Sequence, residues 1–129
     1  AHGVPPNHTD KACPTNRPYP GNGVVIKYSA NQKYTTDAIS AAVFEEICNR
    51  ANVPYQIYVN RSDILGGSTL GNISTTQVPV NTVDIGSARH AFPYETGSVK
   101  DTDYMIQAMK TFFEASVRQT EDGYELKFL

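Results

Sequence analysis

The sequence of 129 residues contains no apolar stretch long enough to span a membrane, and no basic-then-apolar signal segment opens it. It also lacks a charge excess of one sign, with a formal net charge of −2 at pH 7. A chain so close to neutral has no electrostatic footprint for nucleic acid or for an acidic membrane surface. We therefore expect neither a nucleic-acid partner nor a membrane partner.

Cysteine is scarce, and Cys13 and Cys48 are the only two. A small secreted scaffold normally carries more cysteines than this, and Cys48 falls on the face of a predicted helix. We expect two free thiols in a reducing cytosol, and hence a cytoplasmic protein. The first residue is alanine rather than methionine, which we interpret as the loss of an upstream part.

Regular structure is expected to begin only after the first 23 residues, which hold five of the eight prolines. The β-branched run VVIKY at 24–28 predicts a buried strand, and PYQIYVN at 54–60 predicts a second. Between them, residues 36–51 predict a helix that Thr36 or Asp37 caps. Its apolar face is predicted to carry Ile39, Ala42, Val43 and Ile47.

The second half of the chain continues the alternation. A glycine-rich loop at 61–76 precedes a predicted strand at 80–86, and a helix follows at 101–117. Residues 124–129 are either an edge strand or a frayed tail. This order of strands and helices predicts an α/β fold with a mostly parallel or mixed sheet, in which ligands gather beyond the carboxyl ends of the strands. The helix stripe is predicted to hold Met105, Met109, Phe112 and Ser116.

His90 lies in the loop 87–97, just after the third predicted strand. A strand fixes the backbone and the loop aims the side chain, which suits a metal ligand. The same position also suits a loop histidine bonded to solvent or to Glu95, and no second ligand stands at a diagnostic spacing. The residues alone leave both interpretations open.

Other polar residues give weaker signals. His2 and His8 match no zinc-binding spacing, and the residues alone favour structural or solvent-exposed histidines. Lys27 and Tyr34 could contact a substrate carboxylate and a carbonyl oxygen, although a surface lysine and an interfacial tyrosine are the favoured interpretation. The glycines at 66–71 could approach a ligand, but the lysine of a phosphate-binding loop is missing.

Several blocks together resemble the C-terminal third of the aspartyl aminopeptidases. They run in family order from residue 1 to about 117 and read AHGVPPNH, ANQKYTTDA, NRSD…GGSTLG and NTVDIG. The resemblance implies that residues 1–129 are the C-terminal portion of a catalytic domain, with 1–23 an irregular active-site segment, 24–118 an α/β core and 119–129 a tail. The implied fold is part of a three-layer α/β/α zinc-exopeptidase domain with a mixed, mostly parallel sheet.

The same resemblance implies an activity. Members of this family are cytosolic, oligomeric enzymes that release acidic residues, Asp or Glu, from the N-termini of peptides. Two zinc ions activate water for attack on the peptide carbonyl, and a glutamate acts as general base. That glutamate and most metal ligands are expected upstream of Ala1, so the resemblance implies no catalytic residue within this chain.

The resemblance also assigns roles to individual residues of this sequence, position by position. His2 matches a histidine of the family block DMAHAVHPN, whose metal-binding aspartate would precede Ala1, and Pro5 replaces the second histidine. Lys27 and Tyr34 become contacts to the substrate side chain and carbonyl, which overturns the interpretation favoured above. The resemblance also places two residues of the glycine-rich loop, Gly67 and Ser68, along the same pocket.

The last metal ligand of the family falls on His90 when AMHS is matched to ARHA. This alignment needs deletions before His90 and an insertion after it. The alternative alignment matches Glu95 to the glutamate of the family block without that insertion, and it leaves no histidine at the ligand position. In the first alignment Arg89 replaces a methionine, and it must point away from a dication. Two hypotheses follow: a fragment of the enzyme that is inactive alone, or a non-catalytic remnant that acts as a binding or assembly module.

Overall fold

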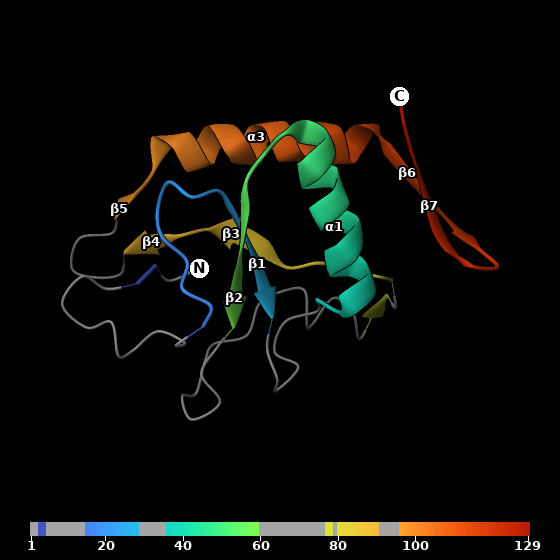
Figure 1. Cartoon of the computed structure of the whole chain (residues 1–129), viewed down its shortest axis with the longest axis horizontal. Coiled ribbons are helices and arrows are strands. Elements are labelled where there is room, and N and C mark those ends of the chain that lie inside the picture. The colour runs from blue at the N-terminus through green and yellow to red at the C-terminus, as the bar shows by residue number, and fades with distance from the viewer. Residues whose placement is uncertain (1–2, 5–14, 29–35, 60–76, 79, 91–95) are drawn as a thin grey trace.

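A three-stranded mixed sheet stands at the centre of the structure, which is a computed structural model (Figure 1). The structure describes residues 3–4, 15–28, 36–59, 77–78, 80–90 and 96–129. The middle strand, β1 (Val24–Tyr28), pairs in parallel with β2 (Tyr55–Val59) and antiparallel with β3 (Ile85–Ser87). The first two strands lie where the sequence predicts them, and the α/β class with a mixed sheet is confirmed.

The helix α1 (Ala38–Ala51) connects β1 to β2, and its ends are defined by polar contacts. The Asp37 side chain accepts the Ser40 backbone N–H at 2.7 Å, and the Ser40 hydroxyl accepts the Asp37 N–H at 3.0 Å. This reciprocal capping box satisfies two donors that the first turn leaves open. At the other end Asn52 adopts a left-handed conformation, φ 55°, which stops the helix. The predicted cap at Asp37 is confirmed.

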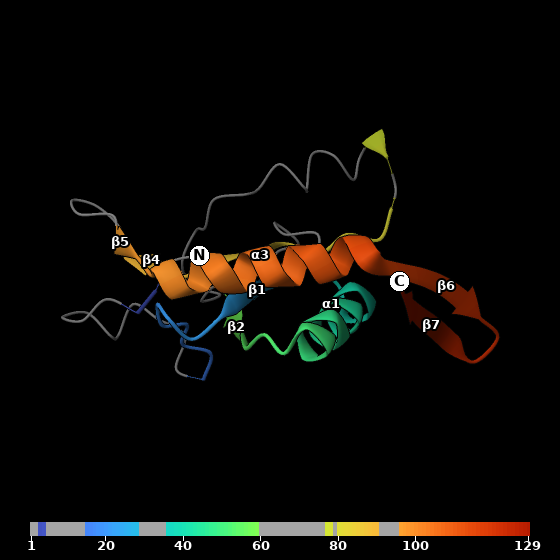
Figure 2. The same cartoon turned by 90° about the horizontal axis from the view of Figure 1, so that it is seen from above.

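A second helix, α3 (Val99–Glu114), lies beside α1 on the same face of the sheet (Figures 1 and 2). The core forms where the two helices meet that face, because strand residues alternate and every second side chain points toward the helices. No helix in the described part of the chain is long and apolar enough to cross a membrane. The buried core residues are Val24, Ile26, Ala41, Phe44, Cys48, Val53 and Ala108.

The buried face of α1 differs from the predicted one. Ile39 is 43% exposed and Ala42 is exposed, whereas Ala41, Phe44 and Cys48 face the sheet. Two apolar stripes run side by side on this helix, and the sequence period alone does not tell which one meets β1. The prediction for Ile47 is confirmed, since it is 1% exposed and lies on the border of both stripes.

On α3 the predicted stripe is also displaced. The fully buried positions are Asp101 and Ala108, and Met105 packs against the core beside them. Phe112, predicted to lie on the buried stripe, is 41% exposed. The helix crosses the edge of the sheet, so its last turns extend beyond the strands and their apolar side chains find no sheet to cover them (Figure 2).

The predicted strand 80–86 begins too early. Only Ile85–Ser87 forms β3, which pairs antiparallel with Val24–Ile26, so the strand begins five residues later than predicted. One further backbone bond, from the Lys27 N–H to the Asp84 carbonyl at 2.8 Å, extends this pairing.

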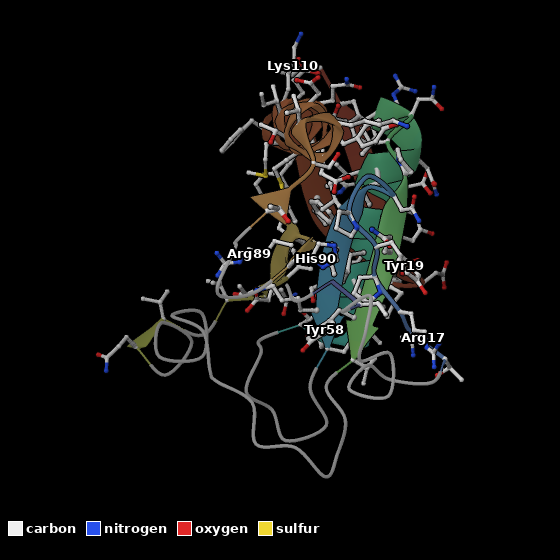
Figure 3. All side chains as sticks on the ribbon, turned by 90° about the vertical axis from the view of Figure 1, so that its left-hand side faces the viewer. Arg17, Tyr19, Tyr58, Arg89, His90 and Lys110 are labelled. Carbon is white, nitrogen blue, oxygen red and sulfur yellow. The ribbon has the colours of Figure 1, made fainter. Side chains whose placement is uncertain are left out.

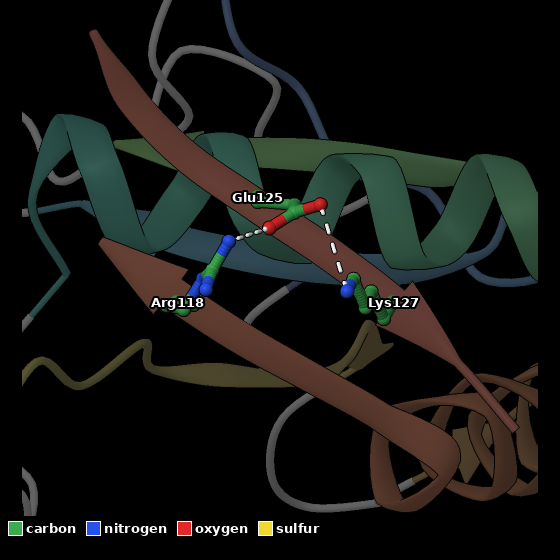
Figure 4. A network of polar contacts seen from close by, with 3 residues as sticks. All are labelled: Arg118, Glu125 and Lys127. Atoms are coloured by element: carbon green, nitrogen blue, oxygen red, sulfur yellow. Dashed lines mark hydrogen bonds and ion pairs between the residues drawn. The ribbon is translucent and has the colours of Figure 1, made fainter. Parts of the chain in front are cut away.

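The predicted helix at 101–117 ends too late. The chain leaves α3 at Glu114 and forms a hairpin of β6 (Ala115–Thr120) and β7 (Gly123–Phe128). Its turn is Glu121–Asp122 followed by Gly123, a glycine-containing hairpin signal. An exposed network joins the strands, in which Arg118 lies 2.7 Å and Lys127 3.9 Å from Glu125 carboxylate oxygens (Figure 4). Leu129 donates its N–H to the Glu114 carbonyl at 3.0 Å and returns the chain to the end of α3.

The sheet face opposite the helices is covered by the residues that precede β1. Gln56 of β2 holds this segment, because its side-chain amide accepts the Tyr19 N–H at 2.8 Å and donates to the Tyr19 carbonyl at 2.9 Å. As predicted, residues 15–23 form neither helix nor strand. Val25, which points to this face, is fully buried.

The thiol of Cys48 is free, as predicted, and fully buried. Burial, with a smaller contribution from Glu45, raises its pKa from 9.0 to about 12. We expect the Cys48 thiol to resist iodoacetamide in the folded chain at pH 8 and to react only on unfolding, as measured by peptide mass spectrometry.

The buried neutral thiol of Cys48 contributes stability that is fully present below pH 9, the ordinary pKa of a cysteine. This contribution is lost as the pH rises from 9 toward 12, because in that range the thiol ionises in the unfolded chain but not in the folded one. Cys48→Ala should flatten this alkaline loss in urea titrations. An unchanged alkaline profile in that variant would contradict the assignment.

Candidate functional site

Lys27 lies near the carboxyl end of β1, in an ion pair with the residue that precedes β3. Its ammonium nitrogen is 2.9 Å from Asp84 Oδ1, and the two side chains are only 15% and 11% exposed. Asp84 is held in turn by its backbone, because its N–H donates to the Thr36 hydroxyl at 2.7 Å. A lysine so enclosed is not the surface lysine that the residue pattern alone favoured.

Tyr58 lies beside Lys27 on the neighbouring strand, since the register of the parallel pair sets these two residues opposite each other. Ile26 and Ile57 point to the helices, so Lys27 and Tyr58 point to the other face of the sheet. Tyr58, Lys27 and Asp84 therefore form a polar row across that face. Because β1 and β2 are parallel, their carboxyl ends lie at the same edge of the sheet, which is where α/β sheets usually bind ligands.

His90 ends the two-residue strand β4 (Arg89–His90), which pairs with β5 (Thr96–Gly97) just before α3. Its Nδ1 atom is buried and has no hydrogen-bond partner among the described residues. Arg89 points away from His90, as successive strand residues do (Figure 3). This orientation meets the condition that the alignment set for Arg89.

The backbone of Arg89 connects β4 to the beginning of the chain. The Gly3 N–H donates to the Arg89 carbonyl at 2.7 Å, and the Val4 N–H donates to the Pro18 carbonyl at 3.0 Å. The residues that follow His2 in the sequence are therefore neighbours of the strand that carries His90. His2 itself lies outside the described residues.

The described residues place Lys27 and His90 at different ends of the sheet. Ser87 pairs with Val24 at the amino end of β1, and β4 continues from there, whereas Lys27 is near the carboxyl end. Three strand residues correspond to about 10 Å. The loop after β3 thus starts from the end opposite to the loops after β1 and β2. The other predicted site residues, Tyr34, Gly67 and Ser68, fall outside the described part.

A buried imidazole nitrogen without a partner suits a metal ligand, because an unpaired buried polar atom is otherwise costly. His90 thus fits a zinc-binding role. Within residues 3–4, 15–28, 36–59, 77–78, 80–90 and 96–129, however, no three His, Cys, Asp or Glu side chains gather closely enough to hold a metal ion. A complete zinc site needs ligands from beyond this part of the chain.

Two enclosed carboxylates were not expected from the sequence: that of Asp84, whose side chain is 11% exposed, and that of Asp101, which is fully buried. Asp84 lies between Val83 and Ile85 in NTVDIG and could have been found as the opposite charge to Lys27 once the strands were paired. Asp101 stands three residues after Ser98, a spacing typical of a helix start. That pattern marks the helix but does not reveal what the carboxylate binds.

The arrangement of the sheet and its two helices is the fold of aminopeptidases of known structure. The chain superposes on a chain of the Ape4 and Nbr1 complex with a TM-score of 0.82 and 31% identity, over 88% of this chain and 22% of that one. It also superposes on the Saccharomyces cerevisiae mApe1 dodecamer structure, with a TM-score of 0.74 and 23% identity, over 88% of this chain and 25% of that one.

Residues 1–113 match the family described as aminopeptidase I zinc metalloprotease (M18), and the chain belongs to this family. It is 47% identical over 116 residues to a probable M18 family aminopeptidase 2 of Clostridium acetobutylicum, covering 88% of this chain and 27% of that protein. It is 38% identical over 117 residues to a probable aspartyl aminopeptidase of Ricinus communis, covering 88% of this chain and 24% of that protein. The chain therefore spans about a quarter of these relatives, and β6–β7 lies beyond the family match.

Proposed function

We propose that this chain is the C-terminal part of a two-zinc aminopeptidase domain that releases N-terminal Asp or Glu from peptides in the cytoplasm. Membership of the M18 family over residues 1–113 carries the proposal. The Nδ1 of His90 is buried and has no hydrogen-bond partner among the described residues, which supports a ligand role for that residue. The complete enzyme is proposed to be a homo-oligomer, in line with the dodecamer of a protein of the same fold.

For the metal, His90 is the proposed ligand from this chain. Bound zinc polarises the scissile carbonyl and supplies an activated water at neutral pH. Arg89 points to the other side of β4, so its charge does not compete with a dication at His90 (Figure 3). The remaining ligands and the general-base glutamate are proposed to come from outside the chain.

For the substrate, Lys27 is the proposed partner of the acidic side chain. It is enclosed, and an ammonium has three donors, so pairing with Asp84 is compatible with a bond to a second carboxylate. Tyr34 is proposed to contact the carbonyl of the substrate, and His2, Gly67 and Ser68 to line its pocket. The naming of the Ricinus communis relative as a probable aspartyl aminopeptidase supports this substrate class.

The isolated chain is expected to be inactive, because a hydrolytic two-zinc site needs several ligands in fixed geometry and this chain supplies one or two. The measurement is steady-state hydrolysis of an aspartyl anilide with added zinc, and we expect no turnover above the buffer rate. Turnover that His90→Ala abolishes would contradict this expectation.

A second candidate, a non-catalytic assembly module, is favoured by a different observation. An apolar groove of about 370 Å³ opens between α1, the end of α3 and the hairpin, and its lining includes Ile39, Val43, Phe112, Val117 and Tyr124. A second copy of the chain is the proposed occupant, because Phe112 and Val117 are 41% and 47% exposed there and a protein of the same fold assembles as a dodecamer. Light scattering separates the candidates, since a chain of 14.2 kDa that remains monomeric at high concentration contradicts the assembly module.

A further inference from the structure

The carboxylate of Asp101 is fully buried in the first turn of α3, yet it faces away from its own helix. Its Oδ2 accepts the Gly21 N–H at 2.7 Å and its Oδ1 accepts the Gly23 N–H at 3.0 Å. No ion pair joins it to a cationic side chain within the part of the chain that the structure describes. Its charge is therefore balanced by backbone dipoles.

The turn that binds this carboxylate, residues 21–23, directs two backbone N–H groups at it and is called the nest below. Gly21 and Gly23 both have positive φ values, 91° and 108°, which lets both N–H groups point to one side. The amino end of α3 adds its positive dipole at the same place. Two backbone donors and a helix end thus converge on one carboxylate of the same chain.

The nest belongs to a segment that is held from both sides. Asp101 holds it on the α3 side, and Gln56 holds Tyr19 on the β2 side. The same segment presents the Pro18 carbonyl to Val4. The residue before Val4, Gly3, bonds to Arg89, which is adjacent to His90. A chain of backbone bonds thus leads from Asp101 to β4.

We propose that Asp101 is a positioning residue of the candidate site. Through residues 18–23 it fixes Gly3 and Val4 against β4 and so sets the place of His90. The link from Asp101 to β4 rests on the bonds above, which act beside the pairing of β4 with β5, whereas the use of His90 for zinc rests on the proposed function. Asp101→Asn removes the charge and leaves one of the two glycine donors facing an amide nitrogen, which cannot accept it.

Amide hydrogen exchange in the 129-residue chain tests this proposal. In Asp101→Asn we expect exchange at least tenfold faster at Gly21, Gly23, Gly3 and Val4, with shifted His90 backbone and ring signals. Amides of the β1–β2 ladder, such as Ile26, should keep their rates. Asp103→Asn is the matched control, because it removes the same charge from an exposed position of the same helix.

Two outcomes would overturn the proposal: unchanged exchange at Gly3 and Val4, or equal acceleration at the β1–β2 ladder, which indicates general destabilisation. If Asp101→Asn fails to fold, Gln56→Ala replaces it, because this change releases the same segment from the β2 side. Amide exchange should then be faster at Gly3 and Val4 and unchanged in the β1–β2 ladder. Unchanged exchange at Gly3 and Val4 in Gln56→Ala would show that the proposal is wrong.

A zinc titration of the unmodified chain, followed by the His90 ring signals, tests separately whether this chain alone binds zinc at His90. Unmoved signals would show that it does not and leave the exchange result to judge the positioning role of Asp101. If zinc moves these signals, Asp101→Asn should weaken that binding, whereas Asp103→Asn should leave it as in the unmodified chain.

Discussion

Replacing Gly23 with alanine is expected to prevent folding. An added Cβ would lie 2.0 Å from the Pro54 carbonyl oxygen and 2.5 Å from its carbon, so the backbone must move. That same oxygen accepts the Val24 N–H at 3.1 Å, the first link between β1 and the chain entering β2. The φ of 108° adds strain for any residue with a side chain.

Gly23→Ala should lower the free energy of unfolding by more than about 4 kcal/mol, which approaches the whole stability of a small domain. Circular dichroism during heating measures it, and we expect no cooperative transition in Gly23→Ala. Gly97→Ala is the matched control, because nothing lies within 4 Å of the added Cβ. A Gly23→Ala chain that melts within a few degrees of the unmodified chain would disprove the close approach to Pro54.

The second large effect is expected for Asp84→Ala. This change removes the carboxylate 2.9 Å from the Lys27 ammonium and leaves a mostly buried charge without that partner. The cost of breaking a buried pair in this way is about 3 kcal/mol. The backbone bonds of Asp84 to Lys27 and Thr36 do not depend on the side chain and should persist.

Urea unfolding of the single variants and of Lys27→Met/Asp84→Leu measures the pair. The double variant should recover most of the loss, because apolar residues of similar volume tolerate burial. Arg118→Ala is the comparison: it breaks an exposed pair with side chains 72% and 39% exposed and should cost under about 1 kcal/mol. Equal losses for Asp84→Ala and Arg118→Ala would contradict the buried character of the first pair.

The sequence predicted those parts of the fold whose signals are local. β1 has the predicted bounds, and α1 begins within two residues of its predicted start because Asp37 supplies a cap. The edge strand offered for residues 124–129 is confirmed by β7, whereas β6 was missed because the helical pattern was continued to Val117, although Glu121–Asp122–Gly123 carried a turn signal. The start of β3 at Ile85 follows from its pairing with Val24–Ile26, which no local signal in the sequence indicates.

For the candidate site, residue type identified Lys27 and His90 but not their surroundings. The pairing of Lys27 with Asp84 joins residues 57 positions apart, and it follows from an antiparallel contact that no periodic pattern encodes. Likewise, the bond from Gly3 to Arg89 joins two segments that share no sequence signal. Contacts between distant segments are set by packing, so they lie beyond pattern analysis.

The bond between the Leu129 N–H and the Glu114 carbonyl has a practical use. It places residue 129 at the far end of α3 from Asp101, His90 and β5 (Figure 1). A helix of 16 residues is about 24 Å long. A linker, dye or immobilising tag joined after Leu129 would therefore emerge well away from the candidate site, which makes this the preferred anchoring point for surface-based binding measurements.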